Sequence, residues 1–211
     1  MKYNWQHKRW PEFEYDISGI EGELLTFADL SGQISGVVNG LGSILQVDAV
    51  IDVMIAEAVK SSEIEGAYLS RPDVASSIRN CLGLQTDIRR ICDPASQGIA
   101  ELMVDSRNSW DENLSEAKLF EWHRMLMKGS RNIEAGCWRS HAEEMQVISG
   151  SIGAEKVLYS APPSEQVADE MNAFTEWFNS SSEKNLRLHS VPQLLISILK
   201  VFIPLKMATD A

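Results

Sequence analysis

The segment from Val50 to Leu69 constrains the fold of this chain most, because it joins a helical spacing to a stop signal. Its apolar positions recur every three or four residues, which places them on one face of an α-helix, and they are Ile51, Met54, Ile55, Ala58 and Val59. Ser61 and Glu65 follow four residues apart, so on a continuing helix they would share one face. Gly66 can take the left-handed conformation that ends a helix. On this spacing alone, an ordinary solvated helix end is favoured over a functional pair.

Length and charge narrow the class of protein. The 211 residues allow one fair-sized domain or two small ones, and 44% hydrophobic residues is ordinary for a soluble globular protein. The net charge of −11 argues against a nucleic-acid partner, which needs basic faces opposite phosphates. The start has no apolar segment typical of a signal peptide, and the longest apolar run, 191–205, is too broken to span a bilayer. We therefore expect a cytoplasmic protein with no membrane and no nucleic-acid partner.

The predicted fold class is mainly α, a helical bundle with one β-hairpin. An aromatic-rich arm comes first, and apolar periodicity then predicts helices over 17–41, 74–82, 95–110, 115–128 and 164–180. His123 lies on the flank of one such helix with no visible partner, and we interpret it as structural. The three cysteines, Cys81, Cys92 and Cys137, have no metal-ligand spacing and are predicted to be buried or free thiols.

A hairpin is predicted at about 145–160. Two short β-prone runs, 145–148 and 156–159, flank a loop that contains Gly150 and Gly153. Pro162 and Pro163 follow the second run and would end its strand. The spacing fits an ordinary hairpin attached to a helical bundle as well as it fits a functional one.

Three segments together resemble the Fic family of proteins. The residues Ser61, Glu65 and Gly66 resemble its inhibitory-helix motif, [S/T]-x-x-x-E-[G/N]. The arm, with Trp5 and a W-P-x-F segment at 10–13, resembles the opening of a subset of the family. The hairpin resembles the family's flap, which reads G-x-[WY]-R, a hairpin, then Y-x-x-P-P; the matching residues are Gly136, Trp138, Arg139, Tyr159, Pro162 and Pro163.

The resemblance implies a function and a set of site residues. Fic proteins mostly transfer AMP from ATP to protein hydroxyls, with Mg²⁺ at the phosphates. It implies a regulatory role for Ser61, Glu65 and Gly66. It also implies that a protein substrate pairs with the flap, whose candidate residues are Gln146, Val147, Ile148, Val157 and Tyr159. Homo-oligomerisation is left open.

The family's catalytic motif, H-x-F-x-[D/E]-G-N-G-R-x-x-R, is missing from this chain. It would supply the base, the metal ligand and the phosphate cradle. We therefore assign no catalytic residue and no metal ligand, and expect ATP and Mg²⁺ to bind productively only in an intact relative. The expected organisation is an arm and inhibitory-helix region at 1–82, a connector at 83–94, the front of a Fic core at 95–189 and an aberrant tail at 190–211.

Two functions fit these observations. The first, which we favour, is the regulatory and target-flap portion of a Fic-type protein adenylyltransferase that is catalytically incomplete. The second is a non-catalytic, antitoxin-like module that donates the inhibitory helix to a partner. Stable, monodisperse protein that captures a chain carrying the Fic motif would favour the second function, and poorly soluble, inert protein would favour the first.

A frameshift near Ser190 would explain the missing motif. Back-translation of 200–211, read two bases later, permits S-I-H-P-F-E-D-G-N-G-R, in which the first glycine is forced by the Met207 and Ala208 codons. We expect the other frame of the coding DNA to carry H-P-F-E-D-G-N-G-R, and residues from about 191 onward to pack poorly or be disordered. Sequencing that DNA is the measurement, and a different reading in the second frame contradicts the hypothesis.

Overall fold

The computed structural model describes residues 3–8, 19–84, 93–151 and 154–180, which fall into two compact units. Unit 1 comprises the described residues of 3–8, 111–124 and 130–180, and unit 2 those of 19–110 and 125–129. The described chain is mainly helical with one two-stranded antiparallel sheet, which confirms the predicted fold class. The predicted tail at 190–211 and most of the predicted connector at 83–94 lie outside the described residues.

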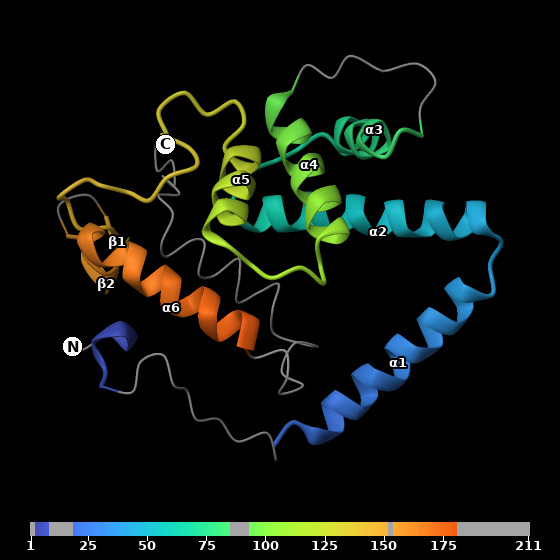
Figure 1. Cartoon of the computed structure of the whole chain (residues 1–211), viewed down its shortest axis with the longest axis horizontal. Helices are drawn as coiled ribbons and strands as arrows, with labels where there is room; N and C mark the ends of the chain where they lie inside the picture. The colour runs from blue at the N-terminus through green and yellow to red at the C-terminus, as the bar shows by residue number, and fades with distance from the viewer. Residues whose placement is uncertain (1–2, 9–18, 85–92, 152–153, 181–211) are drawn as a thin grey trace. The chain divides into compact units, whose positions relative to one another are not determined.

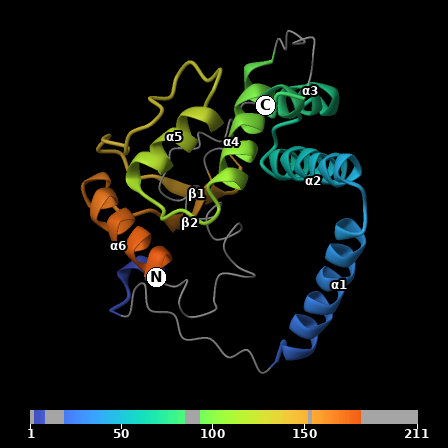
Figure 2. The ribbon, with the colours of Figure 1, turned by 45° about the vertical axis from the view of Figure 1, so that its right-hand side comes forward.

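Unit 2 is built around α2 (Ser43–Ile64). The helices α3 (Arg71–Cys81) and α4 (Pro94–Asn108) lie beside it (Figures 1 and 2). The core they share consists of Ile51, Met54, Ile55, Ala58, Val74, Ile78, Ala100 and Val104. The apolar face predicted for the segment is therefore confirmed, with Val59 partly buried at its edge.

Side-chain caps fix where α3 and α4 begin. The Ser70 hydroxyl accepts a hydrogen bond from the Asp73 amide (3.4 Å), and Pro72 occupies the first turn of α3. The Asp93 carboxylate accepts from the amides of Ala95 and Ser96 (3.1 and 3.0 Å) at the start of α4. These caps fix the first residue of each helix. The residues that follow then place their apolar side chains in the core shared with α2.

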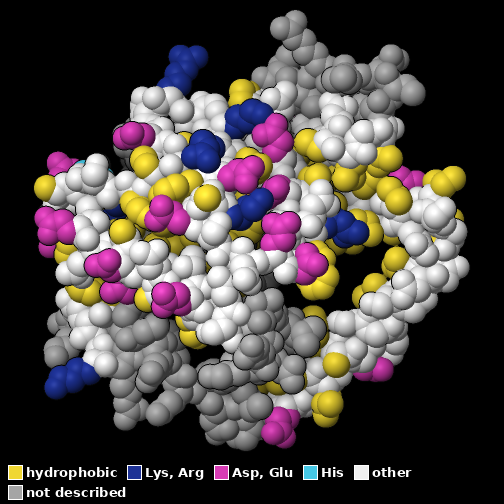
Figure 3. All heavy atoms as spheres, viewed as in Figure 1, with side chains coloured by type: hydrophobic (Ala, Val, Ile, Leu, Met, Phe, Trp, Pro, Cys, Tyr) yellow, Lys and Arg dark blue, Asp and Glu magenta, His cyan; other side chains and the backbone are white. Residues whose placement is uncertain are grey.

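The first helix of unit 2, α1 (Glu21–Asn39), forms where a helix was predicted, but it buries none of its side chains among the described residues. Its apolar side chains reach the surface, as do several at the start of α2 (Figure 3). They are Leu25, Phe27, Leu30, Ile34 and Val37 on α1, and Ile44, Leu45 and Val47 on α2. Periodicity predicted the helix correctly, but it does not state what the apolar face contacts.

Unit 1 contains α5 (Glu116–Leu126, in this unit as far as Arg124), the strands β1 (Gln146–Ser149) and β2 (Lys156–Ser160), and α6 (Val167–Ser180). Short 3-10 turns, η1 (Asn4–Gln6) and η2 (Ser164–Gln166), lie in the arm and before α6. The core of this unit is Leu114, Leu119, Val167, Met171 and Phe174, with Trp122, Trp138 and Phe178 packed against it.

The end of α6 is fastened to the segment before α5. The Asn179 side chain accepts a hydrogen bond from the Leu114 amide (2.8 Å) and donates one to the Leu114 carbonyl (2.9 Å). One amide side chain thereby satisfies both the backbone N–H and the backbone C=O of Leu114. None of the helices in the described ranges is long and apolar enough to cross a membrane.

The buried face of α2 should dominate the stability of unit 2. Replacing Ile51, which is fully buried, by alanine removes core contacts and leaves a cavity, so we expect a loss of about 2–5 kcal/mol. Ile44→Ala is the matched control on the same helix, since Ile44 is 78% exposed, and we expect it to change stability by less than about 0.5 kcal/mol. Urea unfolding followed by circular dichroism measures both, and equal losses would contradict this assignment of the core.

Candidate functional site

The predicted inhibitory motif lies at the carboxyl end of α2 in unit 2. Gly66 has a φ of +78°, and its amide donates to the Glu63 carbonyl (3.0 Å) while the Ala67 amide donates to the Ser62 carbonyl (2.9 Å). This pair of bonds is the Schellman arrangement, in which a left-handed residue closes the last turn. The prediction that Gly66 ends the helix is confirmed, and Glu65 occupies the capping position beside it.

The serine of this motif forms a hydrogen bond with a carboxylate outside the motif. The Ser61 hydroxyl donates to the Glu57 carboxylate, 2.9 Å away and one turn earlier, rather than to Glu65 one turn later. The helix ends at Ile64, so Glu65 is no longer on a continuing helical face. Glu65 is exposed, and its neighbours Ile64 and Tyr68 are exposed apolar side chains. The helix end therefore exposes a carboxylate and two large apolar side chains.

The predicted flap is a β-hairpin in unit 1, at the predicted place. β1 and β2 pair antiparallel, with Val147 opposite Tyr159 and Ile148 opposite Val157, so Leu158 is an extra residue that forms a β-bulge. Val147 and Ile148 are 53% and 56% exposed, and all of β1 is exposed. A bulged, apolar, exposed hairpin is a candidate surface for pairing with another extended segment.

The geometry of the pairing shows which edge of the hairpin is open. The Ala161 amide donates to the Met145 carbonyl (2.8 Å), so the next pair, Gln146 and Ser160, has backbone groups that point outward from both strands. The outward carbonyl of Ser160 accepts a hydrogen bond from the Trp5 indole N–H (2.8 Å). No third strand pairs with either edge within the described residues. The arm therefore uses the outward backbone carbonyl of β2 at Ser160. On β1, the outward backbone groups of Gln146 are placed to pair with an added strand.

A buried arginine joins the two ends of the hairpin. Arg139 donates from Nη2 to the Pro162 carbonyl and from Nη1 to the Ser164 hydroxyl (3.5 Å), and that hydroxyl donates to the His141 carbonyl (2.6 Å). Burial lowers the pKa of the Arg139 guanidinium, while Tyr159 opposes that effect. The Ser164 hydroxyl thus serves this bridge rather than a helix cap, and Pro163 precedes the turn η2.

The turn before the hairpin rests on α5. Gly136 has a φ of +82°, and its amide donates to Nδ1 of His123 (3.1 Å), so the imidazole carries its proton on Nε2. A Cβ at Gly136 would lie 2.2 Å from Arg124 Nη1 and 2.8 Å from its Cγ, so a side chain does not fit there without rearrangement. Next along the chain, Trp138 donates to Glu116 (3.0 Å) and meets the Phe120 ring edge-on at 4.6 Å.

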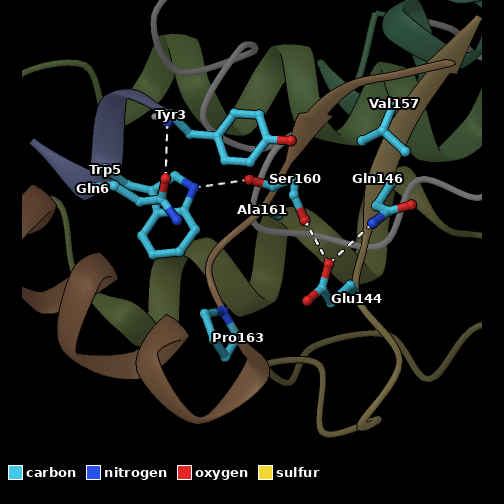
Figure 4. A pocket seen from close by; sticks show the side chains of 9 residues that line it. All are labelled: Tyr3, Trp5, Gln6, Glu144, Gln146, Val157, Ser160, Ala161 and Pro163. Carbon is cyan, nitrogen blue, oxygen red and sulfur yellow. Dashed lines mark hydrogen bonds between the residues drawn. The ribbon is translucent and has the colours of Figure 1, made fainter. Parts of the chain in front are cut away.

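The arm and the hairpin line an open cavity of about 320 Å³ in unit 1 (Figure 4). Its lining consists of Tyr3, Trp5, Gln6, Glu144, Gln146, Val157, Ser160, Ala161 and Pro163. The Tyr3 ring meets the Tyr159 ring edge-on at 5.3 Å, and burial together with Glu170 raises the pKa of the Tyr159 hydroxyl. Glu144 is the charged member of the lining, and its Oε2 accepts from Ser160 Oγ and Gln146 Nε2, both at 3.0 Å.

The structure brings the predicted site residues together in two sets. One set is Ser61, Glu65 and Gly66 in unit 2, and the other is Gln146, Val147, Ile148, Val157 and Tyr159 in unit 1. Sequence reasoning missed Tyr3, Gln6 and Glu144, and the acid just before the first strand was the available signal for Glu144. Across the described ranges no group of three or more His, Cys, Asp or Glu could hold a metal ion.

Part of the chain matches a known protein family. Residues 3–84 match a family described as a domain of unknown function, DUF4172. The match includes the arm, α1, α2 with its end motif, and α3, and it covers less than half of the chain. No curated protein matches the chain.

The buried imidazole makes a pH prediction. Burial and the neighbouring Arg124 lower the pKa of His123, so the native state binds a proton less readily than the unfolded chain. The stabilisation by neutral His123 is then present above the ordinary pKa of about 6.5 and is lost as pH falls through the lowered pKa. His123→Asn keeps an acceptor near Nδ1 without titrating, so it should reduce the loss of unfolding free energy between about pH 7.5 and about pH 5.5.

Urea unfolding at several pH values measures this slope. His7→Asn, at an exposed position, is the control and should leave the slope unchanged. An unaltered slope in His123→Asn would contradict the role of the buried imidazole.

Proposed function

We propose that this chain carries the target-docking flap and the regulatory helix end of a Fic-type protein adenylyltransferase, without that enzyme's catalytic motif. The observation that carries the proposal is the frame around the hairpin. Four of the residues that resemble the flap signature form hydrogen bonds beside an exposed hairpin, and they are Gly136, Trp138, Arg139 and Pro162. Chance agreement with the signature would not require these four residues to support the same hairpin.

Strand addition is the binding mode that such a hairpin suits. An extended segment of a target protein pairing with β1 would gain main-chain hydrogen bonds while its side chains are read only weakly. The exposed Val147 and Ile148 would then lose water-exposed apolar surface on binding. This combination suits an enzyme that must hold a hydroxyl-bearing segment still without reading a long sequence.

The helix end of α2 would supply regulation in an intact relative. An exposed carboxylate at Glu65, held at a fixed helix end by Gly66, is suited to pairing with an arginine that would otherwise bind ATP phosphate. The same geometry also favours the second candidate, an antitoxin-like module. Ile64 and Tyr68, 79% and 83% exposed, offer apolar contacts near this helix end to a partner chain.

Labelling with ATP tests the enzyme lineage. Incubated with radiolabelled ATP and Mg²⁺, the chain should transfer no AMP to itself or to other proteins, and Glu65→Gly should not change this. In the product of the gene with the second frame restored, we expect labelling, and Glu65→Gly should raise it by about tenfold or more because the arginine is released for phosphate binding.

The matched control is Glu63→Gly, which removes another exposed glutamate from the same helix end. Glu63 forms an ion pair with Lys60 (2.6 Å). This variant should leave labelling within about twofold of the restored parent. Labelling by the chain as it stands, or equal activation by both glycine variants, would contradict the proposal. Capture of a Fic-motif chain by this protein, lost in Glu65→Gly, would instead select the antitoxin-like module.

A further inference from the structure

We propose that the cavity between the arm and the hairpin binds a basic side chain, lysine or arginine, from the extended segment that pairs with β1. This inference rests on the proposed docking function and adds a selectivity to it. The cavity has about 320 Å³ of space, lies within one unit and borders β1 through Gln146 (Figure 4).

The lining of the cavity matches the chemistry of a long cationic side chain. Tyr3, Trp5 and Val157 offer aromatic and aliphatic surface, and Glu144 contributes a carboxylate. A lysine or arginine has an alkyl stem that packs against apolar walls and a cationic head that needs a carboxylate or an aromatic face. An acidic or purely apolar side chain would satisfy only part of this lining.

Hydrogen bonds already hold the carboxylate in place. Oε2 of Glu144 accepts from Ser160 and from Gln146, one residue on each strand, so the side chain is oriented before any ligand arrives. Orienting it in advance lowers the entropy cost of forming a further bond. Ser160 and Gln146 face each other across the hairpin, so the carboxylate lies on the face that both side chains share.

The open edge directs a side chain into this cavity. A segment added to β1 opposite Gln146 would place one of its side chains on the same face as the Gln146 side chain, about 4.5–5.5 Å away between Cβ atoms. That face borders the cavity. The Trp5 indole occupies the outward carbonyl of Ser160, so the segment is directed to β1 rather than to β2 at this point.

Two peptides separate the cavity from the edge. We would titrate the ¹⁵N-labelled chain at low salt with acetyl-Thr-Val-Lys-Val-Thr-amide and with the same peptide carrying norleucine in place of lysine. The Gln146 backbone amide reports strand pairing, and the Trp5 indole N–H reports the cavity. We expect both signals to shift, and the lysine peptide to bind about fivefold more tightly than the norleucine peptide.

Variants assign the effect to one carboxylate. Glu144→Gln keeps an acceptor for Ser160 but removes the charge, so it should abolish the preference for lysine. Glu143→Gln, the exposed neighbour, should keep the preference. Equal affinity for both peptides, or a preference that survives in Glu144→Gln, would overturn the cavity assignment and leave the docking function standing. If neither peptide shifts the Gln146 amide, both proposals are overturned.

Discussion

The hairpin of unit 1 depends on one buried cation. Burying a guanidinium is costly unless its N–H groups are satisfied, and Arg139 meets this requirement with oxygens from the segment after the hairpin. The Pro162 carbonyl and the Ser164 hydroxyl are its acceptors, and neither is a carboxylate. The bridge therefore ties the chain before β1 to the chain after β2. Two strands alone are marginal in water, so this closure supplies order that the sheet lacks.

Two uncharged side chains, those of His123 and Trp138, also support the loop before the hairpin. Nδ1 of His123, on α5, accepts a hydrogen bond from the Gly136 amide. Gly136 has a left-handed conformation and is followed two residues later by Trp138. Trp138 in turn packs into the core of the unit. The loop before β1 is thus held by a cation, an imidazole and an indole, while the strands remain exposed. Rigidity in the frame and exposure in the strands are what a docking surface needs, because a pre-ordered edge loses less entropy on binding.

Local patterns in the sequence predicted local features well. The period of α2 identified its buried face, and Gly66 and the proline pair marked a helix end and a strand end, because backbone conformation at such positions is decided by a few neighbouring residues. The bond from Trp5 to Ser160 spans 155 residues, and no periodicity encodes a contact of that separation. The hydrogen-bond partner of Ser61 could not be read from spacing, because a carboxylate lies one turn earlier, at Glu57, as well as one turn later, at Glu65.

The arm makes the two edges of the hairpin different, because it forms a hydrogen bond with only one of them among the described residues. A two-stranded sheet presents two edges, and a free edge pairs with any extended chain. In this unit the outward carbonyl at Ser160 already has the Trp5 indole, and the Tyr3 ring covers Tyr159 beside it. The edge of β2 therefore has one fewer carbonyl available for pairing at its carboxyl end. The edge of β1 keeps the outward N–H and C=O groups of Gln146 available for pairing. The arm falls in the stretch that matches the domain of unknown function, whereas the hairpin lies outside it. The matched stretch therefore does more than form helices of its own, since its first residues complete a surface whose strands come from far along the chain.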